Sequence, residues 1–215
     1  SIKERMEIMY AKNTWEKYKD QLNEVFDYNE GYKHYISKNK TERACVKDSI
    51  KLAEEKGFKP LESFDTLKSG DKVYVTNREK NIALFIIGKK PLTEGMRILG
   101  AHIDSPRMDL KQNPLYENEE LAYLDTHYYG GIKKYQWVTI PLAIHGTIAK
   151  KDGTVRDIII GEKEDDPVLV ISDLLIHLSQ QQIEKKAGVV VEGEGLDILV
   201  ATKPLTGDAE LEKEE

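Results

Sequence analysis

The segment Met96–Asp109, with the sequence MRILGAHIDSPRMD, is the part of the chain on which the predicted fold depends most. An apolar pair, Ile98-Leu99, leads through two small residues to His102 and Asp104, and Pro106 then breaks the pattern. This order predicts a buried strand whose carboxyl end presents an imidazole and a carboxylate at one point. Ligands bind at that end of the strands in open α/β sheets, so we expect the functional site here.

Two helices are predicted upstream of this strand. Thr14 can cap a helix whose apolar residues recur at helical spacing, an arrangement typical of core packing, and Gly31 is expected to interrupt it. Thr41 opens a second helix that runs to about Lys56, and Gly57 ends it in the position that favours a left-handed residue. The apolar residues of the first helix are Trp15, Tyr18, Leu22, Val25 and Phe26.

A β-hairpin is predicted between the second helix and the segment quoted above. Residues Lys72–Thr76 alternate, the chain turns over Asn77–Asn81, and Ile82–Ile87 returns as a nearly continuous apolar run. A strand that is apolar on both faces is typical of one covered by other layers on both sides. The order helix, helix, hairpin, buried strand predicts an α/β domain.

Beyond Pro106 the pattern becomes mainly β. Asn113-Pro114 marks a turn, residues Gln136–Ile160 read as strands, and Asp152-Gly153 is a strong hairpin-turn signal. A domain boundary is therefore expected between Pro106 and Asn113.

The end of the β region is predicted to hold a short helix and a last strand pair. Ser172 can cap the helix, and the strands Val189–Val191 and Leu196–Val200 flank a turn at Gly193-Glu194-Gly195. The predicted domains are a first domain at residues 1–110, a mainly β domain at 111–205 and an acidic tail at 206–215.

Composition favours a soluble globular protein. Hydrophobic residues make up 40% and charged residues 33% of the 215 positions, and no apolar run is long enough to cross a bilayer. The single cysteine, Cys45, cannot form an internal disulfide, so a cytoplasmic location is expected. The net charge of -6 argues against a nucleic-acid partner. Residues 208–215, DAELEKEE, end the chain without an apolar closing element, which indicates that the sequence has been cut.

The pair His102 and Asp104 is the strongest candidate site, although the bare pattern is weak. Acids occupy 38 of 215 positions, so one of five histidines followed by an acid two places later is unsurprising. The structural alternative is a strand-end histidine held by a neighbouring carboxylate. The preceding small residues favour function because they let a ligand approach the backbone. The carboxylate can also accept the second imidazole N–H and fix the tautomer that binds a metal.

Other candidate sites are weaker. A catalytic zinc needs about three protein ligands, and the sequence shows no phosphate-binding glycine loop and no G-x-S-x-G nucleophile motif. Glu192 and Glu194, beside turn glycines, are typical of solvated acids. Four further histidines each lack a companion at metal-ligand spacing: His34, His127, His145 and His177.

Four segments, in order along the chain, resemble the aspartyl aminopeptidase family of di-zinc metalloaminopeptidases, which includes vacuolar aminopeptidase I. The first, GAHIDSPRMDLKQNPLYE at residues 100–117, resembles the first metal-site segment of that family. Together the matches cover most of the chain, from about Thr41 to Pro204. The other segments are THYYGGIKKYQW at 126–137, ISDLLIHLSQQ at 171–181 and VEGEGLDILVATKPL at 191–205.

The resemblance implies an α/β fold in which a partial zinc-peptidase core is interrupted by an inserted, mainly β dimerisation domain. By that analogy His102 ligates one zinc, Asp104 acts in catalysis by orienting that ligand, and His177 binds substrate in the partner subunit's active site. His177 follows Ser172-Asp173, where many relatives have Pro-His. The resemblance also implies a peptide substrate and a homodimer, with a tetrahedral dodecamer as the larger assembly of the complete chain.

The family's other metal ligands and its general base lie downstream of the last residue, Glu215. One histidine cannot hold two zinc ions, so we expect the N-terminal half of a longer peptidase that is inactive alone. The predicted function of the parent is a zinc-dependent aminopeptidase that hydrolyses N-terminal residues, acidic ones among the candidates. Two alternatives stay open: an oligomerisation module without chemistry of its own, and an unrelated α/β binding protein with a chance His-x-Asp pair.

Overall fold

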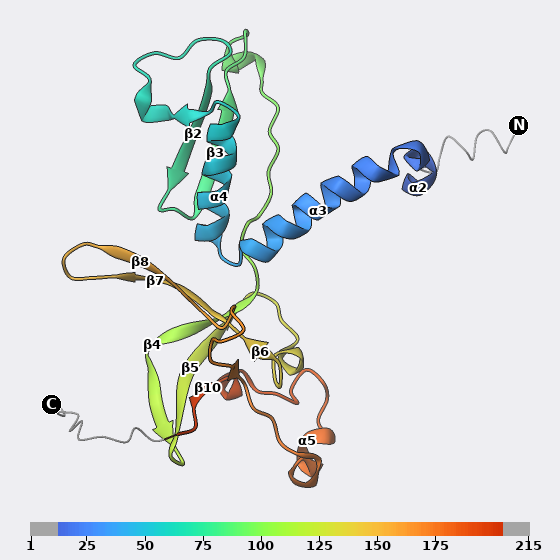
Figure 1. Ribbon diagram of the computed structural model, residues 1–215, viewed down its shortest axis with the longest axis vertical. Helices are drawn as coiled ribbons and strands as arrows, with labels where there is room; N and C mark the ends of the chain where they lie inside the picture. Colours follow the sequence, from blue (N-terminus) through green and yellow to red (C-terminus); the bar gives the residue numbers. More distant parts are fainter. Residues whose placement is uncertain (1–12, 204–215) are drawn as a thin grey trace, which may run out of the picture. The chain divides into compact units, whose positions relative to one another are not determined.

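The computed structural model describes residues 13–203, and the chain divides into two units between Asp104 and Ser105 (Figure 1). The boundary predicted from the sequence, between Pro106 and Asn113, lies just after this division. The acidic tail predicted at residues 206–215 lies outside the described residues. The assignment of the two units to a catalytic and a dimerisation domain stays a prediction.

Helices make up the first part of unit 1, the unit that ends at Asp104. Asn13, not Thr14, caps the first of them, because its side-chain oxygen accepts the Trp15 N–H at 3.0 Å. The longest helix runs through Gly31 without a break, since one glycine costs a helix only about 1 kcal/mol. The elements are α2 (Thr14–Lys17), the 3-10 turn η1 (Lys19–Gln21), α3 (Leu22–Lys38) and α4 (Glu42–Glu55).

The aromatic stripe of α2 and α3 is exposed, so the prediction that it packs in a core is wrong for the described chain. Trp15 is 60% and Phe26 54% exposed, and the centroids of their rings lie 6.1 Å apart. No residue of α2 or α3 is buried. Residues 13–203 therefore supply no covering layer for this face.

Helix α4 begins and ends as its sequence predicts. The Thr41 hydroxyl accepts the Ala44 N–H at 3.2 Å, which caps the first turn. At the other end Gly57 has a φ of 84°, and the next N–H, of Phe58, returns to the Ala53 carbonyl at 3.0 Å. This is the Schellman arrangement, which needs a left-handed residue at its glycine position.

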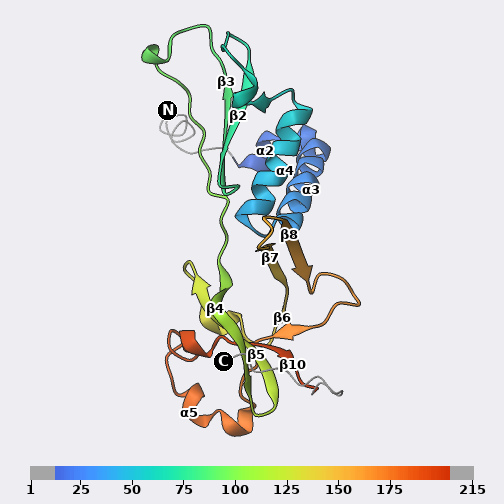
Figure 2. The same cartoon turned by 90° about the vertical axis from the view of Figure 1, so that its left-hand side faces the viewer.

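A three-stranded sheet lies against α4 in unit 1 (Figure 2). Its strands are β1 (Lys59–Pro60), β2 (Lys72–Asn77) and β3 (Asn81–Ile86), in the order β1-β2-β3. β2 and β3 form the predicted hairpin, closed by Arg78 and Glu79, which both have positive φ. β3 is mostly exposed, so the prediction that both of its faces are covered is wrong for the described chain.

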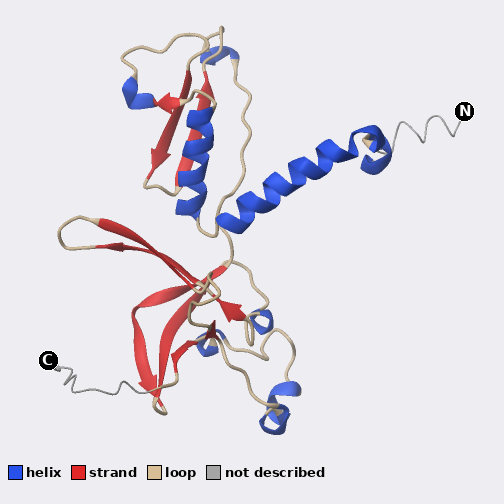
Figure 3. Cartoon of the chain, viewed as in Figure 1, coloured by secondary structure: helices blue, strands red, loops and turns tan. Residues whose placement is uncertain are grey.

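The segment Met96–Asp109 contains no buried strand. Residues 95–106 follow the short helix η3 (Leu92–Glu94) and carry neither helix nor strand (Figure 3), and Ile98-Leu99 is exposed. The predicted strand is therefore wrong. A strand forms only where neighbouring chain satisfies its N–H and C=O groups, and no described segment pairs with residues 95–106.

Unit 2 is mainly β, and its main sheet has the strand order β4-β5-β10-β9-β6. A turn at Glu119 and Glu120, both with positive φ, joins the long pair β4 and β5. Asn113-Pro114 is not the predicted turn: it lies inside β4, where the register with β5 shifts between Leu110 and Leu115. The strands are β4 (Arg107–Asn118), β5 (Leu121–Tyr129), β6 (Pro141–Leu142), β9 (Leu169–Val170) and β10 (Ile198–Ala201).

A separate hairpin of β7 (Ile144–Ala149) and β8 (Val155–Ile160) confirms the turn predicted at Asp152-Gly153. Gly153 has a φ of 83°, a left-handed conformation that glycine adopts readily. The 3-10 turn η4 (Lys134–Gln136) precedes β6.

The last part of unit 2 differs from its prediction. Ser172 caps no helix, and the helical turns that follow it are η5 (Ile176–Leu178) and α5 (Gln180–Ile183). Val189–Val191 is not a strand, and β10 pairs with β5 and β9 instead. The glycine turn forms η6 (Gly193–Gly195). The buried core of unit 2 comprises Val138, Leu169, Ile171, Val191, Leu196 and Ile198.

None of the helices found in residues 13–203 is both long and apolar enough to span a membrane.

Candidate functional site

His102 and Asp104 lie in contact within the irregular segment at the end of unit 1. The imidazole Nδ1 is 3.1 Å from the main-chain oxygen of Asp104 and 3.4 Å from its carboxylate oxygen Oδ1. The chain brings the two residues together by bending, since this segment forms no strand. A proton on Nδ1 donates to these oxygens, and the other ring nitrogen, Nε2, then keeps the lone pair that a metal needs.

The pair can supply part of the ligand set of a zinc centre but not all of it. The His102 side chain is 85% and the Asp104 side chain 42% exposed, so a ligand can reach both. Among residues 13–203, no group of three or more His, Cys, Asp or Glu side chains is placed to hold a metal ion. Because a zinc centre needs about three protein ligands, the described residues supply part of a donor set.

Two other histidines have structural roles in unit 2. His145 Nε2 lies 2.7 Å from Glu162 Oε1, which joins β7 to the loop after β8. The ring of His127 stacks on Tyr128 with the centroids 5.5 Å apart. These contacts account for both side chains without a metal.

The residues that directly follow the His-Asp pair are anchored within unit 2. Arg107 Nε donates to Asp109 at 2.7 Å, and the guanidinium lies 4.1 Å from the ring centroid of Tyr129. Pro106 packs against Gly130, where an added Cβ would lie 3.7 Å from the proline. The start of β4 is thus held to the end of β5 by a cation–π contact and close packing, while the ion pair within β4 orients the arginine.

His177 lies in unit 2 beside a cavity of about 880 Å³, a size within the range of ligand sites. Most of its lining comes from two segments, residues 172–182 and residues 190–195. The His177 imidazole has no polar partner among the described residues, which leaves it available to a ligand. The polar lining includes Asp173, His177, Gln182, Lys185, Glu192 and Glu194.

Polar contacts join residues 182 and 185 to the second lining segment, residues 190–195. The Gln182 side-chain amide donates to the Asp173 carboxylate at 2.8 Å and to the Val190 carbonyl at 3.5 Å. The Lys185 ammonium lies 3.3 Å from the Glu192 carboxylate. The helical turns that carry His177 are therefore tied to residues 190–192.

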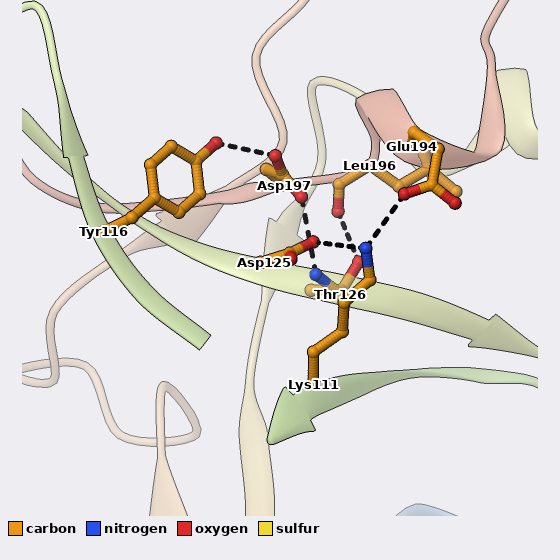
Figure 4. Close-up of polar contacts among 7 residues, drawn as sticks. All are labelled: Lys111, Tyr116, Asp125, Thr126, Glu194, Leu196 and Asp197. Atoms are coloured by element: carbon orange, nitrogen blue, oxygen red, sulfur yellow. Dashed lines mark hydrogen bonds and ion pairs between the residues drawn. The ribbon is translucent and has the colours of Figure 1, made fainter. Parts of the chain in front are cut away.

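A network of polar contacts fastens the next residues, 194–197, to β4 and β5 (Figure 4). Lys111 Nζ lies 2.8 Å from Asp125 and 2.9 Å from Glu194, and hydrogen bonds to these two carboxylates raise the pKa of Lys111 above its ordinary value. The Tyr116 hydroxyl donates to Asp197 at 2.6 Å, and this bond, with burial, raises the pKa of Tyr116 to about 12.

The structure therefore brings two of the three predicted site residues together and leaves their roles as predictions. His102 and Asp104 are in contact, and His177 belongs to the other unit. Glu192 and Glu194 are exposed, as expected for solvated acids, and each also pairs with a lysine. Sequence reasoning missed the lysine partner of Glu194 because it lies 83 positions earlier, and no local pattern signals such a pair.

The sequence of the chain matches a known protein family and several known relatives. The model of the aminopeptidase I zinc metalloprotease (M18) family matches residues 35–215. A probable M18 family aminopeptidase 1 of Clostridium acetobutylicum is 57% identical over 207 residues, which cover 94% of this chain and 44% of the relative. The corresponding protein of Thermotoga maritima is 45% identical over 200 residues, or 93% of this chain and 43% of that relative.

Solved structures agree with the sequence matches. The crystal structure of an M18 aminopeptidase from Thermotoga maritima matches with a TM-score of 0.85 and 43% identity, covering 94% of this chain and 44% of that one. Aminopeptidase I from Clostridium acetobutylicum matches with a TM-score of 0.76 and 56% identity, over 95% and 44% of the two chains. The chain thus spans less than half the length of the relatives it matches.

Proposed function

Because the chain belongs to the aminopeptidase I zinc metalloprotease (M18) family, we propose that the protein it represents is a zinc-dependent aminopeptidase that hydrolyses N-terminal residues from peptides. One observation carries the proposal: the family match runs over residues 35–215 and includes the exposed His102–Asp104 pair. The chain spans 44% of its Clostridium acetobutylicum relative, so the proposal concerns the whole protein. An assembly module without chemistry is not favoured, since the matched relatives are named aminopeptidases.

In this proposal His102 is a zinc ligand and Asp104 its orienting partner. The contacts of Nδ1 with the Asp104 main-chain and carboxylate oxygens support these roles, because a proton on Nδ1 would leave the lone pair of Nε2 available to a metal. Two zinc ions in the complete site, with the remaining ligands from outside residues 13–203, belong to the same proposal. Zinc, when bound, polarises the scissile carbonyl and activates the attacking water.

His177 is proposed to contact the peptide substrate, in a homo-oligomer whose subunits meet through unit 2. The free imidazole beside a cavity of about 880 Å³ supports the substrate contact. The exposed apolar side chains around it, Leu175, Ile176 and Leu178, support a subunit interface. Among structures of the same fold, mApe1 of S. cerevisiae is a dodecamer; it is 23% identical, with a TM-score of 0.62.

The decisive experiment measures zinc and activity together in the full-length protein. Aminoacyl chromogenic substrates, with Asp and Glu among the N-terminal residues, are assayed with and without a chelator, and bound zinc is measured by elemental analysis. His102→Ala is expected to lose zinc and activity, whereas His34→Ala, an exposed histidine of α3, retains both. Activity that survives chelation, or that His102→Ala leaves intact, contradicts the proposal. The 215 residues alone are expected to be inactive.

A further inference from the structure

Strand β4 contains a bulge where its pairing with β5 changes register. Leu110 pairs with Thr126, but the next partners are Leu115 and Leu124, so four residues of β4 lie opposite the single residue Asp125. Pro114, inside this stretch, has no N–H to donate to the ladder, which is why prolines in strands occur at bulges. Bulges redirect the side chains that they carry.

Lys111 is the first of the four residues in this bulge. Its ammonium bridges two carboxylates from different parts of unit 2. One belongs to Asp125 on β5, at 2.8 Å, and the other to Glu194 in η6, at 2.9 Å (Figure 4). Lys111 is therefore the cation that separates two like charges. Through Glu194, which lines the cavity, Lys111 also connects the bulge of β4 to the cavity.

The residues after η6 are fixed firmly to the sheet. Leu196 is fully buried, and its carbonyl accepts the Thr126 hydroxyl at 2.6 Å. Asp197 accepts the Tyr116 hydroxyl at 2.6 Å. An added Cβ at Gly193 would lie 2.9 Å from the Tyr128 ring, so the loop there packs directly on β5. Residues 193, 196 and 197 are thus held to the sheet by packing and hydrogen bonds, and Lys111 holds Glu194, which lies between them.

The other lining segment, residues 172–182, carries His177. Leu175 and Leu178, on either side of the histidine, are each 71% exposed. Its polar links to residues 190–195 are the bond from Gln182 to Val190 and the ion pair of Lys185 with Glu192. The placement of His177 over the cavity therefore depends on the placement of residues 190–195.

We propose that Lys111 is a positioning residue for the substrate cavity: it fixes the Glu192–Gly195 wall against which the His177 segment is held. This inference rests on the proposed function, in which His177 contacts the peptide. Without the ammonium, the Asp125 and Glu194 carboxylates repel each other, and the wall loosens. Peptide binding weakens as a result, while the metal chemistry at His102 is unchanged.

The kinetic test compares Lys111→Met, Lys111→Arg and Glu194→Gln in the full-length protein. Lys111→Met is expected to raise KM about three- to tenfold with kcat nearly unchanged, the size expected for one lost charge-assisted contact. Lys111→Arg keeps the cation and is expected to restore KM. Lys33→Met, which breaks an exposed ion pair with Glu30 in α3, is the matched control and leaves KM unchanged.

Hydrogen exchange in the full-length protein tests whether Lys111 holds residues 193–195 in place, without relying on activity. The amides of Gly193–Gly195 should exchange faster in Lys111→Met than in the parent chain or in Lys111→Arg. If the exchange rates are unchanged, Lys111 does not hold residues 193–195 in place. If exchange is faster but KM is unchanged, Lys111 is not a positioning residue for the cavity. A fall in kcat and melting temperature with KM constant would show that Lys111 is merely structural. If the full-length parent is inactive, the proposed function is refuted. The hydrogen-exchange comparison still shows whether Lys111 holds residues 193–195 in place.

Discussion

His102 is held by the residue two positions after it: its Nδ1 atom lies 3.1 Å from the main-chain oxygen of Asp104 and 3.4 Å from the Asp104 carboxylate. The main-chain oxygen is present whatever the side chain at position 104, whereas the carboxylate is lost when Asp104 is replaced. The two contributions to the orientation of the imidazole are therefore separable by mutation.

Asp104→Asn is expected to weaken zinc binding by the full-length protein about 10- to 100-fold, because metal-bound imidazoles lose basicity when their carboxylate partner is removed. His102→Ala removes the ligand itself and has the larger effect. Competition with a chromogenic chelator measures both affinities. Asp20→Asn, at an exposed aspartate of η1, controls for the loss of one negative charge. Equal zinc affinity in Asp104→Asn and the parent would contradict the orienting role.

Two glycine-to-alanine changes are expected to act in opposite directions. Gly57 has a φ of 84°, so Gly57→Ala strains the end of α4 and costs about 1 kcal/mol. Gly31 lies inside α3 with open space around it, so Gly31→Ala stabilises the helix by about 0.5–1 kcal/mol. Urea unfolding followed by circular dichroism measures both. The same sign for both variants would contradict the helical assignments.

Thr126→Val removes a hydroxyl that is buried at the centre of unit 2. Thr126 is 1% exposed and donates to the Leu196 carbonyl at 2.6 Å, so the change leaves a buried acceptor unpaired and costs about 1–3 kcal/mol. Trp137 fluorescence in a Trp15→Phe background reports the unfolding of unit 2 alone. Thr202→Val, at an exposed threonine, is expected to change stability by less than about 0.5 kcal/mol. A similar cost at both threonines would argue against this bond.

Asp166 makes a pH-dependent contribution to the stability of unit 2. Its carboxylate accepts the N–H groups of Lys163, Gly161 and Glu162 at 3.1, 2.8 and 3.1 Å, and these bonds lower its pKa below the ordinary 3.8. The contribution is therefore present above pH 3.8 and is lost as the pH falls through the lowered value. Asp166→Asn should destabilise unit 2 at neutral pH, with a difference that shrinks in acid. A pH-independent difference in urea unfolding would refute this.

Several local features follow from residues close together in the sequence. Thr41 and Gly57 bound α4, and Asp152-Gly153 turns the β7–β8 hairpin, as predicted. Each of these features depends on contacts between residues a few positions apart, so the local sequence is enough to predict it. The ordered segments that resemble the aminopeptidase family also indicated the family to which the chain belongs.

Other local predictions failed because sequence neighbours do not decide them. Gly31 was expected to break a helix that continues, and Ile98-Leu99 was expected to lie in a buried strand. An apolar run becomes a strand only beside other strands, and residues 13–203 place none next to it. The contact of His102 with Asp104 was anticipated, but through strand alternation and not through the bend that produces it.

The sequence by itself determined the two ends of α4, the hairpin turns after β2 and β7, the His-Asp pair and the family. Only the tertiary structure decided that β10 pairs with β5 and not with residues 189–191, and that Lys111 meets Glu194 across 83 positions. Such contacts form where packing brings distant segments together. Their energies depend on distance and burial in space, and no spacing along the chain encodes either.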